Sequence, residues 1–239
     1  MVGQPLEIDL GIAKTEKSAS RDSGDTVEFV ERPSGGFSVV MIDGQGSGQA
    51  AKTLSLLLSS KAVTLLKEGV RDGVVARATH DFLFAFRHGQ VSATFDVLSI
   101  DLKTRTVVVT RNAEAAMLVG EQGAFRLEPS GSGPIGRYRW TKPAVAEFPM
   151  VAGLQVILFT DGIPHSGRRQ GRTPLDLLAL ASRFAPDQPA QALADSVLAE
   201  AIARDGDRPN DDMAVVALSL RARAAGMVVR RMQALVPLP

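Results

Sequence analysis

The sequence predicts an α+β fold in which strand-rich stretches separate two pairs of helices. Short runs of β-branched residues recur along the chain, and their length and composition favour buried strands. One pair of helical patterns follows the run that ends at Asp43, and a second pair follows the run that ends at Asp161. Between the pairs, residues 93–148 favour one strand after another, unlike the strand–helix alternation of parallel folds.

Strands are expected wherever a β-branched run is bounded by polar or turn residues. In chain order they cover residues 6–13, 27–30, 37–42, 93–101, 106–111, 116–119, 144–148, 156–160 and 213–218. Residues 101–106 connect two of these strands as a hairpin turn. The glycine-rich stretch 129–136 is expected to be a loop within one domain, because strand signals lie on both sides of it.

Helices are expected over residues 50–69, 72–87, 174–184 and 188–204. The first places its leucines near one stripe and stops at Gly69, and the third opens with a capping Thr173 and a first-turn Pro174. A final helix from Arg221 onward is also considered, with one apolar side formed by Met227, Val228, Met232 and Leu235.

Bulk composition narrows the function classes. The chain has 239 residues, a net charge of +1 and no cysteine, which excludes disulfides, thiolate metal sites and cysteine nucleophiles. The balanced charge gives no reason to expect nucleic acid as a partner. No apolar run approaches the roughly 18 residues of a membrane span, and no signal pattern opens the chain. We therefore expect a cytoplasmic protein without membrane contact.

Aspartates stand at the ends of the strongest strand signals, as Gly24-Asp25, Asp43-Gly44, Asp161-Gly162 and Asp211-Asp212. A single aspartate at such a place is usually a turn former or a cap. Several brought side by side would raise one another's pKa and repel unless a cation lay among them. Oxygen ligands without cysteine select hard cations such as Mg²⁺ or Mn²⁺.

The order of these motifs resembles the SpoIIE-like branch of the metal-dependent (type 2C, PPM) protein serine/threonine phosphatases. In that family a Gly-Asp opens the domain, and an Asp-Gly-x-Gly-x-Gly element follows one strand hairpin. A Thr-Asp-Gly comes late, and an acidic pair begins the last strand. The matching elements here are Gly24-Asp25, residues 43–48 (DGQGSG), Thr160-Asp161-Gly162 and Asp211-Asp212-Met213.

The resemblance implies a four-layer α-β-β-α sandwich, with two central antiparallel sheets flanked by helix pairs. It would span residues 1–220, and residues 221–239 would form a basic tail or helix. It also implies two Mn²⁺ or Mg²⁺ ions, with Asp43 as their bridge. The ligands and catalytic residues implied by position are Asp25, Asp43, Asp161 and Asp211, and the carbonyl of Gly44 would be a further ligand. Asp211 is favoured over Asp212, because many relatives carry asparagine after the ligand.

The reaction implied by the resemblance is hydrolysis of phosphoserine or phosphothreonine in a protein by a metal-activated water. The chain looks like the stand-alone phosphatases of bacterial stress regulation, which act on phosphorylated antagonists of anti-sigma factors. Two substrate contacts are considered. Arg21, like Lys17, precedes Gly24-Asp25, and His165 stands where relatives often have an acid. Because His165 replaces that acid, a third metal site that relies on it is in doubt. The family's Asn-Ala-Gly-His segment appears here as Asn112-Ala-Glu-Ala115, without the Gly-His.

Two other interpretations remain open. The chain could be a phosphatase fold that captures a partner without catalysis, which the changed segments at Glu114 and His165 keep possible. Residues 44–53 also resemble a P-loop, but Ala51 stands where glycine is required and Asp43 would repel a bare phosphate. Nucleotide binding is therefore the least favoured function.

Overall fold

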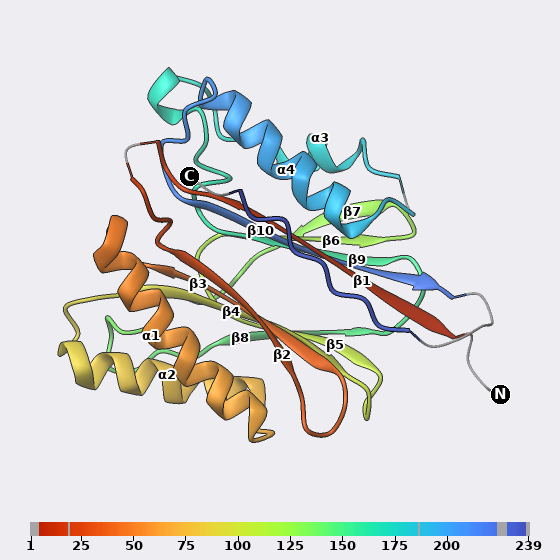
Figure 1. The fold of residues 1–239 in the computed structure, drawn as a ribbon, viewed down its shortest axis with the longest axis horizontal. Coiled ribbons are helices and arrows are strands. Elements are labelled where there is room, and N and C mark those ends of the chain that lie inside the picture. Colours follow the sequence, from red (N-terminus) through yellow and green to blue (C-terminus); the bar gives the residue numbers. More distant parts are fainter. Residues whose placement is uncertain (1–4, 19, 186, 224–228, 238–239) are drawn as a thin grey trace.

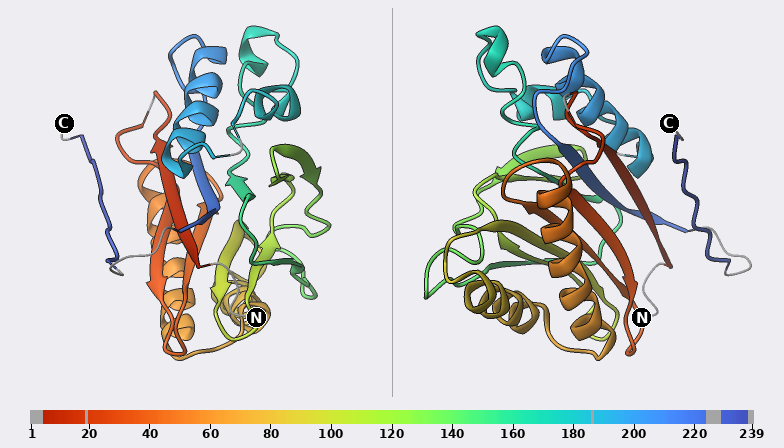
Figure 2. Two further views of the ribbon diagram at one scale, coloured as in Figure 1. Left: turned by 90° about the vertical axis from the view of Figure 1, so that its right-hand side faces the viewer. Right: turned by 60° about the vertical axis from the view of Figure 1, so that its left-hand side comes forward.

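Two five-stranded antiparallel sheets lie face to face, with helices on both outer surfaces (Figure 1). The computed structural model describes residues 5–18, 20–185, 187–223 and 229–237. The predicted four-layer sandwich is confirmed. Figure 2 shows the same layers from the side, with α1 and α2 on one outer surface and α3 and α4 on the other.

The first sheet has the strand order β1-β10-β9-β6-β7. Its strands are β1 (Leu6–Thr15), β6 (Met117–Glu121), β7 (Ala124–Glu128), β9 (Leu154–Phe159) and β10 (Met213–Ala222). The helices α3 (Leu177–Ala181) and α4 (Ala190–Arg204) cover its outer face. A short 3₁₀ turn, η1 (Arg168–Gln170), lies between β9 and α3.

The second sheet has the strand order β2-β3-β4-β5-β8. Its strands are β2 (Asp25–Glu31), β3 (Phe37–Gly44), β4 (Ala93–Asp101), β5 (Thr106–Asn112) and β8 (Ala144–Pro149). The helices α1 (Gly48–Lys67) and α2 (Asp72–Arg87) pack on its outer face. All pairings are antiparallel, so β3 and α1 lack the parallel βα context of a P-loop.

Strands buried on both faces explain the continuous apolar runs in the sequence. Along β3, Val39 and Met41 face the other sheet, whereas Val40 and Ile42 face α1 and α2. Side chains alternate in this way because successive residues of a strand point to opposite faces. Three apolar layers result, one between the sheets and one under each helix pair.

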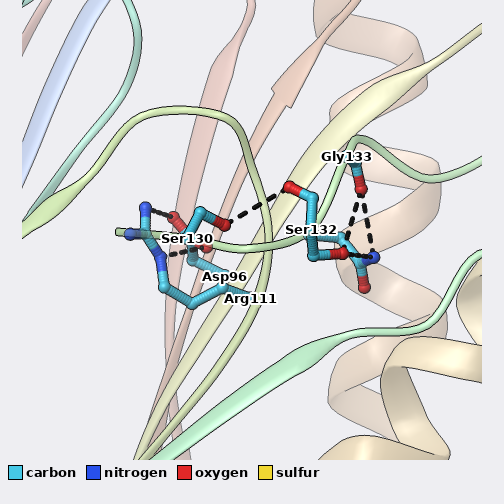
Figure 3. A network of polar contacts seen from close by, with 6 residues as sticks. Asp96, Arg111, Ser130, Ser132 and Gly133 are labelled. Carbon is cyan, nitrogen blue, oxygen red and sulfur yellow. Dashed lines mark hydrogen bonds and ion pairs between the residues drawn. The ribbon is translucent and has the colours of Figure 1, made fainter. Parts of the chain in front are cut away.

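One buried ion pair interrupts the layer between the sheets. Arg111 on β5 and Asp96 on β4 are register partners, and two hydrogen bonds of 3.0 and 3.2 Å join the guanidinium to the carboxylate. Figure 3 shows this pair beside Ser130. Both side chains are only 2–3% exposed, so each charge depends on the other for compensation.

Three details differ from the sequence prediction. Strand β7 was missed, because it has only five residues (AFRLE) without regular alternation, and at the sheet edge most of them are exposed. Helix α3 is confined to Leu177–Ala181, since its Asp176 cap sets a later start than Pro174. The predicted C-terminal helix is wrong for residues 229–237, which have no regular structure, and Met232 and Leu235 are exposed there. Met227 and Val228 lie outside the described residues.

Residues 221–222 complete β10 and pair with β1 instead of starting a helix. The apolar side expected for a helix meets no core in the described part of the tail, so packing gives it no stabilisation. Within the described ranges, no helix combines the length and the apolar character needed to cross a membrane.

Candidate metal centre

The predicted acids gather where four strands begin or end at one edge of the sandwich. Asp25 opens β2 and Asp43 nearly closes β3, and the two are register partners. Partners in an antiparallel pair have Cα atoms about 4.5–5.5 Å apart. In the facing sheet, Asp161 follows β9 and Asp211 precedes β10, and these two strands are also paired.

The hydroxyl of Thr160 joins the two sheets at this edge. It donates a 2.9 Å hydrogen bond to Oδ2 of Asp25 and accepts a 2.9 Å hydrogen bond from the backbone N–H of Ala214. Thr160 directly precedes Asp161, so this contact holds the end of β9, with Asp161, close to Asp25 at the start of β2. All three residues in the contact are buried.

The two neighbouring aspartates before β10 have different roles. Oδ1 of Asp212 accepts a 3.0 Å hydrogen bond from the backbone of Lys17, and Oδ2 accepts one of 2.9 Å from Gly24. Asp212 is buried and holds the segment before β2 in place. Asp211 is exposed, and among the described residues its carboxylate accepts one hydrogen bond, at Oδ1 from the N–H of Asp212.

Mutual repulsion links the four predicted ligands. Burial, followed by the charges of Asp25, Asp161 and Asp211, raises the pKa of Asp43 from 3.8 to about 9. Burial also raises the pKa of Asp25 to about 7, although the hydrogen bond from Thr160 opposes the increase. Although Asp211 is exposed by surface area, partial desolvation of its carboxyl group and the charge of Asp161 raise its pKa. Charges affect one another's pKa in this way only when they lie near one another, so the four carboxylates lie in one region of the structure.

The backbone around these acids leaves no room for extra side-chain atoms. A Cβ on Gly44 would lie 2.5 Å from the carbonyl oxygen of Ala51, and one on Gly162 would lie 2.2 Å from that of Asp212. Glycine is therefore required at both positions, which the Asp-Gly motifs reflect. The end of β3 therefore packs closely against the start of α1, and the residues after β9 pack closely against those before β10.

Two lysines partly offset the negative charge at Asp25. The ammonium groups of Lys14 on β1 and Lys52 on α1 each donate a 2.9 Å hydrogen bond to the backbone carbonyl of Asp25. Lys52 also donates to Oγ1 of Thr26. Burial, together with the charge of Lys14, lowers the pKa of Lys52. Neither lysine was predicted, because only the packing of β1 and α1 against β2 brings them together.

The donor set fits a hard divalent cation. Oδ1 of Asp25 is buried and accepts no hydrogen bond from the described residues, so this oxygen is available to a cation. All the grouped donors are oxygens, which Mg²⁺ and Mn²⁺ prefer. In the described residues no three Asp, Glu or His side chains already converge on one point. The acids are neighbours that a cation would draw together, not a closed coordination shell.

The remaining predicted residues are His165, Arg21 and Lys17, and none of their side chains forms a hydrogen bond with the carboxylates of the cluster among the described residues. His165 is exposed, and its Nδ1 lies 3.9 Å from Oδ2 of Asp161, beyond hydrogen-bonding distance. Its backbone N–H donates to the carbonyl of Asp161. Arg21 is exposed in the segment before β2, and Lys17 contributes its backbone N–H to Asp212. Their proposed substrate contacts therefore stay predictions.

Solved structures share this fold over most of the chain. The phosphatase domain with a regulatory fragment of SpoIIE from Bacillus subtilis matches with a TM-score of 0.81 and 20% identity, over 93% of this chain and 66% of that one. The RsbU and RsbW domains of Rv1364c from Mycobacterium tuberculosis match with 0.74 and 20%, over 93% and 62%. RsbX in complex with magnesium matches with 0.68 and 15%, over 91% and 100%. These matches define the fold of the chain as that of the PP2C-type protein phosphatases.

The family follows from the sequence itself. The family model described as Stage II sporulation protein E (SpoIIE) matches residues 33–221, so the chain belongs to the SpoIIE family. Its members are PP2C protein phosphatases, which are metal-dependent hydrolases. No curated protein matches the chain. The resemblance inferred from the four aspartate motifs is confirmed.

Proposed function

We propose that this chain hydrolyses phosphoserine or phosphothreonine in a protein substrate, using two Mn²⁺ or Mg²⁺ ions held by the acidic cluster. The observation that carries the proposal is the buried oxygen Oδ1 of Asp25, which has no hydrogen-bond partner among the described residues and belongs to the register partner of Asp43. Burial raises the pKa of both carboxyl groups, and the charges of Asp25, Asp161 and Asp211 add to the increase at Asp43. Buried carboxylates placed this close destabilise the fold when no cation is bound, and such arrangements are typical of functional sites.

The ligands we propose are the carboxylates of Asp25, Asp43, Asp161 and Asp211 and the carbonyl oxygen of Gly44. Asp43 suits the bridging position, because the charges of the other three acids all act on it. Divalent cations in such a site supply an acidic water as nucleophile and offset charge on the phosphoryl oxygens.

The surrounding residues hold the ligands in position. Thr160 fixes the rotamer of Asp25 by its hydrogen bond to Oδ2, which leaves Oδ1 for the cation. Lys14 and Lys52 hold the backbone of Asp25. We propose that the exposed His165, near Asp161, or Arg21 contacts the phosphoprotein, since neither side chain forms a hydrogen bond to another of the described residues.

The proposed substrate is a phosphorylated regulator of the partner-switching type, such as an anti-sigma-factor antagonist. The support is that matched structures include RsbU and RsbW domains and a protein from work on the bacterial stressosome. The chain spans 66% of the SpoIIE structure and 62% of the structure with the RsbU and RsbW domains. Both of those proteins therefore contain regions that this chain does not match.

The decisive experiment measures hydrolysis of p-nitrophenyl phosphate and of a phosphoserine peptide with Mn²⁺, Mg²⁺ or chelator. Asp161→Asn and chelator should each abolish turnover. The matched control is Asp81→Asn, which makes the same change at an exposed acid on α2. Cation binding without any turnover would instead support the partner-binding interpretation.

A further inference from the structure

A basic aromatic loop, Arg137 to Lys142, stands beside the acidic cluster. It contains the only tryptophan and the only tyrosine of the chain, together with three cations, in the sequence RYRWTK. No acid occurs between Glu128 and Glu147. Trp140 is 85% exposed and Tyr138 is 63% exposed, so neither aromatic side chain serves the core. Large aromatic side chains left in solvent are typical of binding surfaces.

The base of this loop lies next to the metal centre. Ile135 forms a bridge with Ala93, and Ala93 is the register partner of Gly44. Two strand spacings of about 4.8 Å therefore separate Ile135 from Gly44, or about 10 Å. The loop begins two residues beyond that point, at the edge of the sandwich where the strands carrying the acids begin and end.

Both ends of the loop are fixed. On one side the N–H of Gly136 donates a 3.0 Å hydrogen bond to Nδ1 of the buried His80 on α2. On the other side the carbonyl of Lys142 accepts a 2.6 Å hydrogen bond from Ser132. Asn112, at the end of β5, donates to Ser132 and to the carbonyl of Gly133, and Figure 3 shows the contacts around Ser132 and Gly133. A loop fixed in this way loses little entropy when a partner binds.

The charges of the loop have no partner among the described residues. No ion pair there involves Arg137, Arg139 or Lys142, all of which are exposed. Arg139 lies over the ring of Trp140, with 5.4 Å between the guanidinium carbon and the ring centroid, and Arg137 lies 6.0 Å from that of Tyr138. The result is a surface of alternating cations and aromatic rings.

We propose that this loop is the docking surface for the phosphoprotein substrate, and that it selects acidic and apolar residues near the phosphorylated serine. The inference rests on the proposed function. At about 3.3 Å per extended residue, the distance of 10 Å or more from Gly44 corresponds to substrate positions about three to six residues from the phosphoserine. Because the metal centre is acidic, cations beside it also favour an anionic substrate.

Trp140 provides a direct test, since its fluorescence is the chain's only tryptophan signal. The probe is a synthetic phosphoserine peptide with Asp, Glu and Leu three to six residues from the phosphoserine. In chelator, where no turnover occurs, this peptide should shift the emission of Trp140 to shorter wavelength. The same peptide with lysine in place of its acids should not. An absent shift, or an equal shift with the lysine peptide, overturns the proposal.

A kinetic measurement gives a second readout. In the triple variant Arg137→Ala/Arg139→Ala/Lys142→Ala, the ratio of kcat/KM for the acidic phosphopeptide to that for p-nitrophenyl phosphate should fall about tenfold, as expected for three partly exposed charge contacts. The matched control removes three exposed cations elsewhere, in Lys61→Ala/Lys67→Ala/Arg71→Ala, and should leave the ratio unchanged. An equal fall in both variants would refute specific docking.

Two further comparisons identify the class of partner and separate docking from catalysis. A single-stranded oligonucleotide or a vesicle of anionic lipid that shifts Trp140 more strongly than the acidic peptide would assign the loop to another class of partner and overturn the inference. A peptide-induced shift without hydrolysis of either substrate would instead remove the proposed function and leave the docking surface in place.

Discussion

Asp212→Asn should destabilise the fold, whereas Asp211→Asn should abolish cation binding and leave the fold intact. The two residues are adjacent in the chain, but Asp212 uses both carboxylate oxygens to hold the backbone of Lys17 and Gly24. An asparagine keeps one acceptor and turns a donor toward the second N–H. Hydrogen bonds to a charged group contribute about 1.5–3 kcal/mol, so the loss should be about 2–3 kcal/mol.

That loss sets the expected change in unfolding temperature. In a domain of this size 1 kcal/mol corresponds to about 2–4 °C, so Asp212→Asn should lower Tm by roughly 4–12 °C. In Asp211→Asn the substitution removes repulsion from Asp161, since that charge and burial raise the pKa of Asp211. The Tm of this variant without metal should equal or exceed that of the parent protein.

Two measurements check the pair. Thermal unfolding followed by circular dichroism in chelator reports the fold, and calorimetric titration with Mn²⁺ reports the ligands. Asp81→Asn on α2 controls for the loss of an exposed acid. The reasoning is refuted if Asp212→Asn loses Mn²⁺ binding at an unchanged Tm while Asp211→Asn binds normally.

Further variants test the other contacts of the site and core. Thr160→Val should weaken Mn²⁺ binding about tenfold or more in calorimetry, because it frees the rotamer of Asp25, and Thr160→Ser should restore it. Arg111→Met should lower the free energy of unfolding in urea by about 3–5 kcal/mol, because it leaves the buried carboxylate of Asp96 without a partner. Adding Asp96→Leu should restore much of that free energy. If it does not, an uncompensated charge is not the cause. In chelator, stability should fall as pH rises from about 4 to 9, because the raised pKa values of Asp25 and Asp43 let the folded protein keep protons that the unfolded chain releases. Saturating Mn²⁺ should flatten that profile in thermal unfolding, and a flat profile in chelator would contradict proton retention by these two aspartates.

The acidic cluster was predictable because each of its members has a local signal. Each stands beside a strong strand signal, which needs no distant information. Asp43 and Asp161 are also followed by a glycine, and a Cβ on either glycine would collide with Ala51 or Asp212. The sequence favoured Asp211 over Asp212 as a ligand, and the hydrogen bonds of Asp212 to the backbone supply a physical reason. The holding role of Thr160 was not predicted, although its motif was noted, because its partners Asp25 and Ala214 belong to different sheets.

The parts that escaped prediction depend on distant contacts or on weak local patterns. Lys14 and Lys52 meet at one carbonyl only because β1 and α1 flank the edge of β2. Strand β7 is short and mostly exposed, so its alternation of apolar residues is weak. The C-terminal segment has a helical apolar pattern, but in residues 229–237 that pattern meets no core, and helices of this length need packing to form in water.

The acidic cluster and the basic aromatic loop are held in place by different contacts. We therefore expect substitutions in the loop to change substrate specificity without changing the hydrolytic reaction. The acids are fixed by strand register and by glycines that admit no side chain, so their arrangement tolerates little variation. The basic aromatic loop is attached through the Ile135–Ala93 bridge and the contacts of His80 and Ser132, none of which uses the exposed side chains themselves. In the docking role that we propose, substitutions at its tip should therefore alter substrate choice without disturbing the aspartates of the acidic cluster, as is general for binding loops on a rigid scaffold.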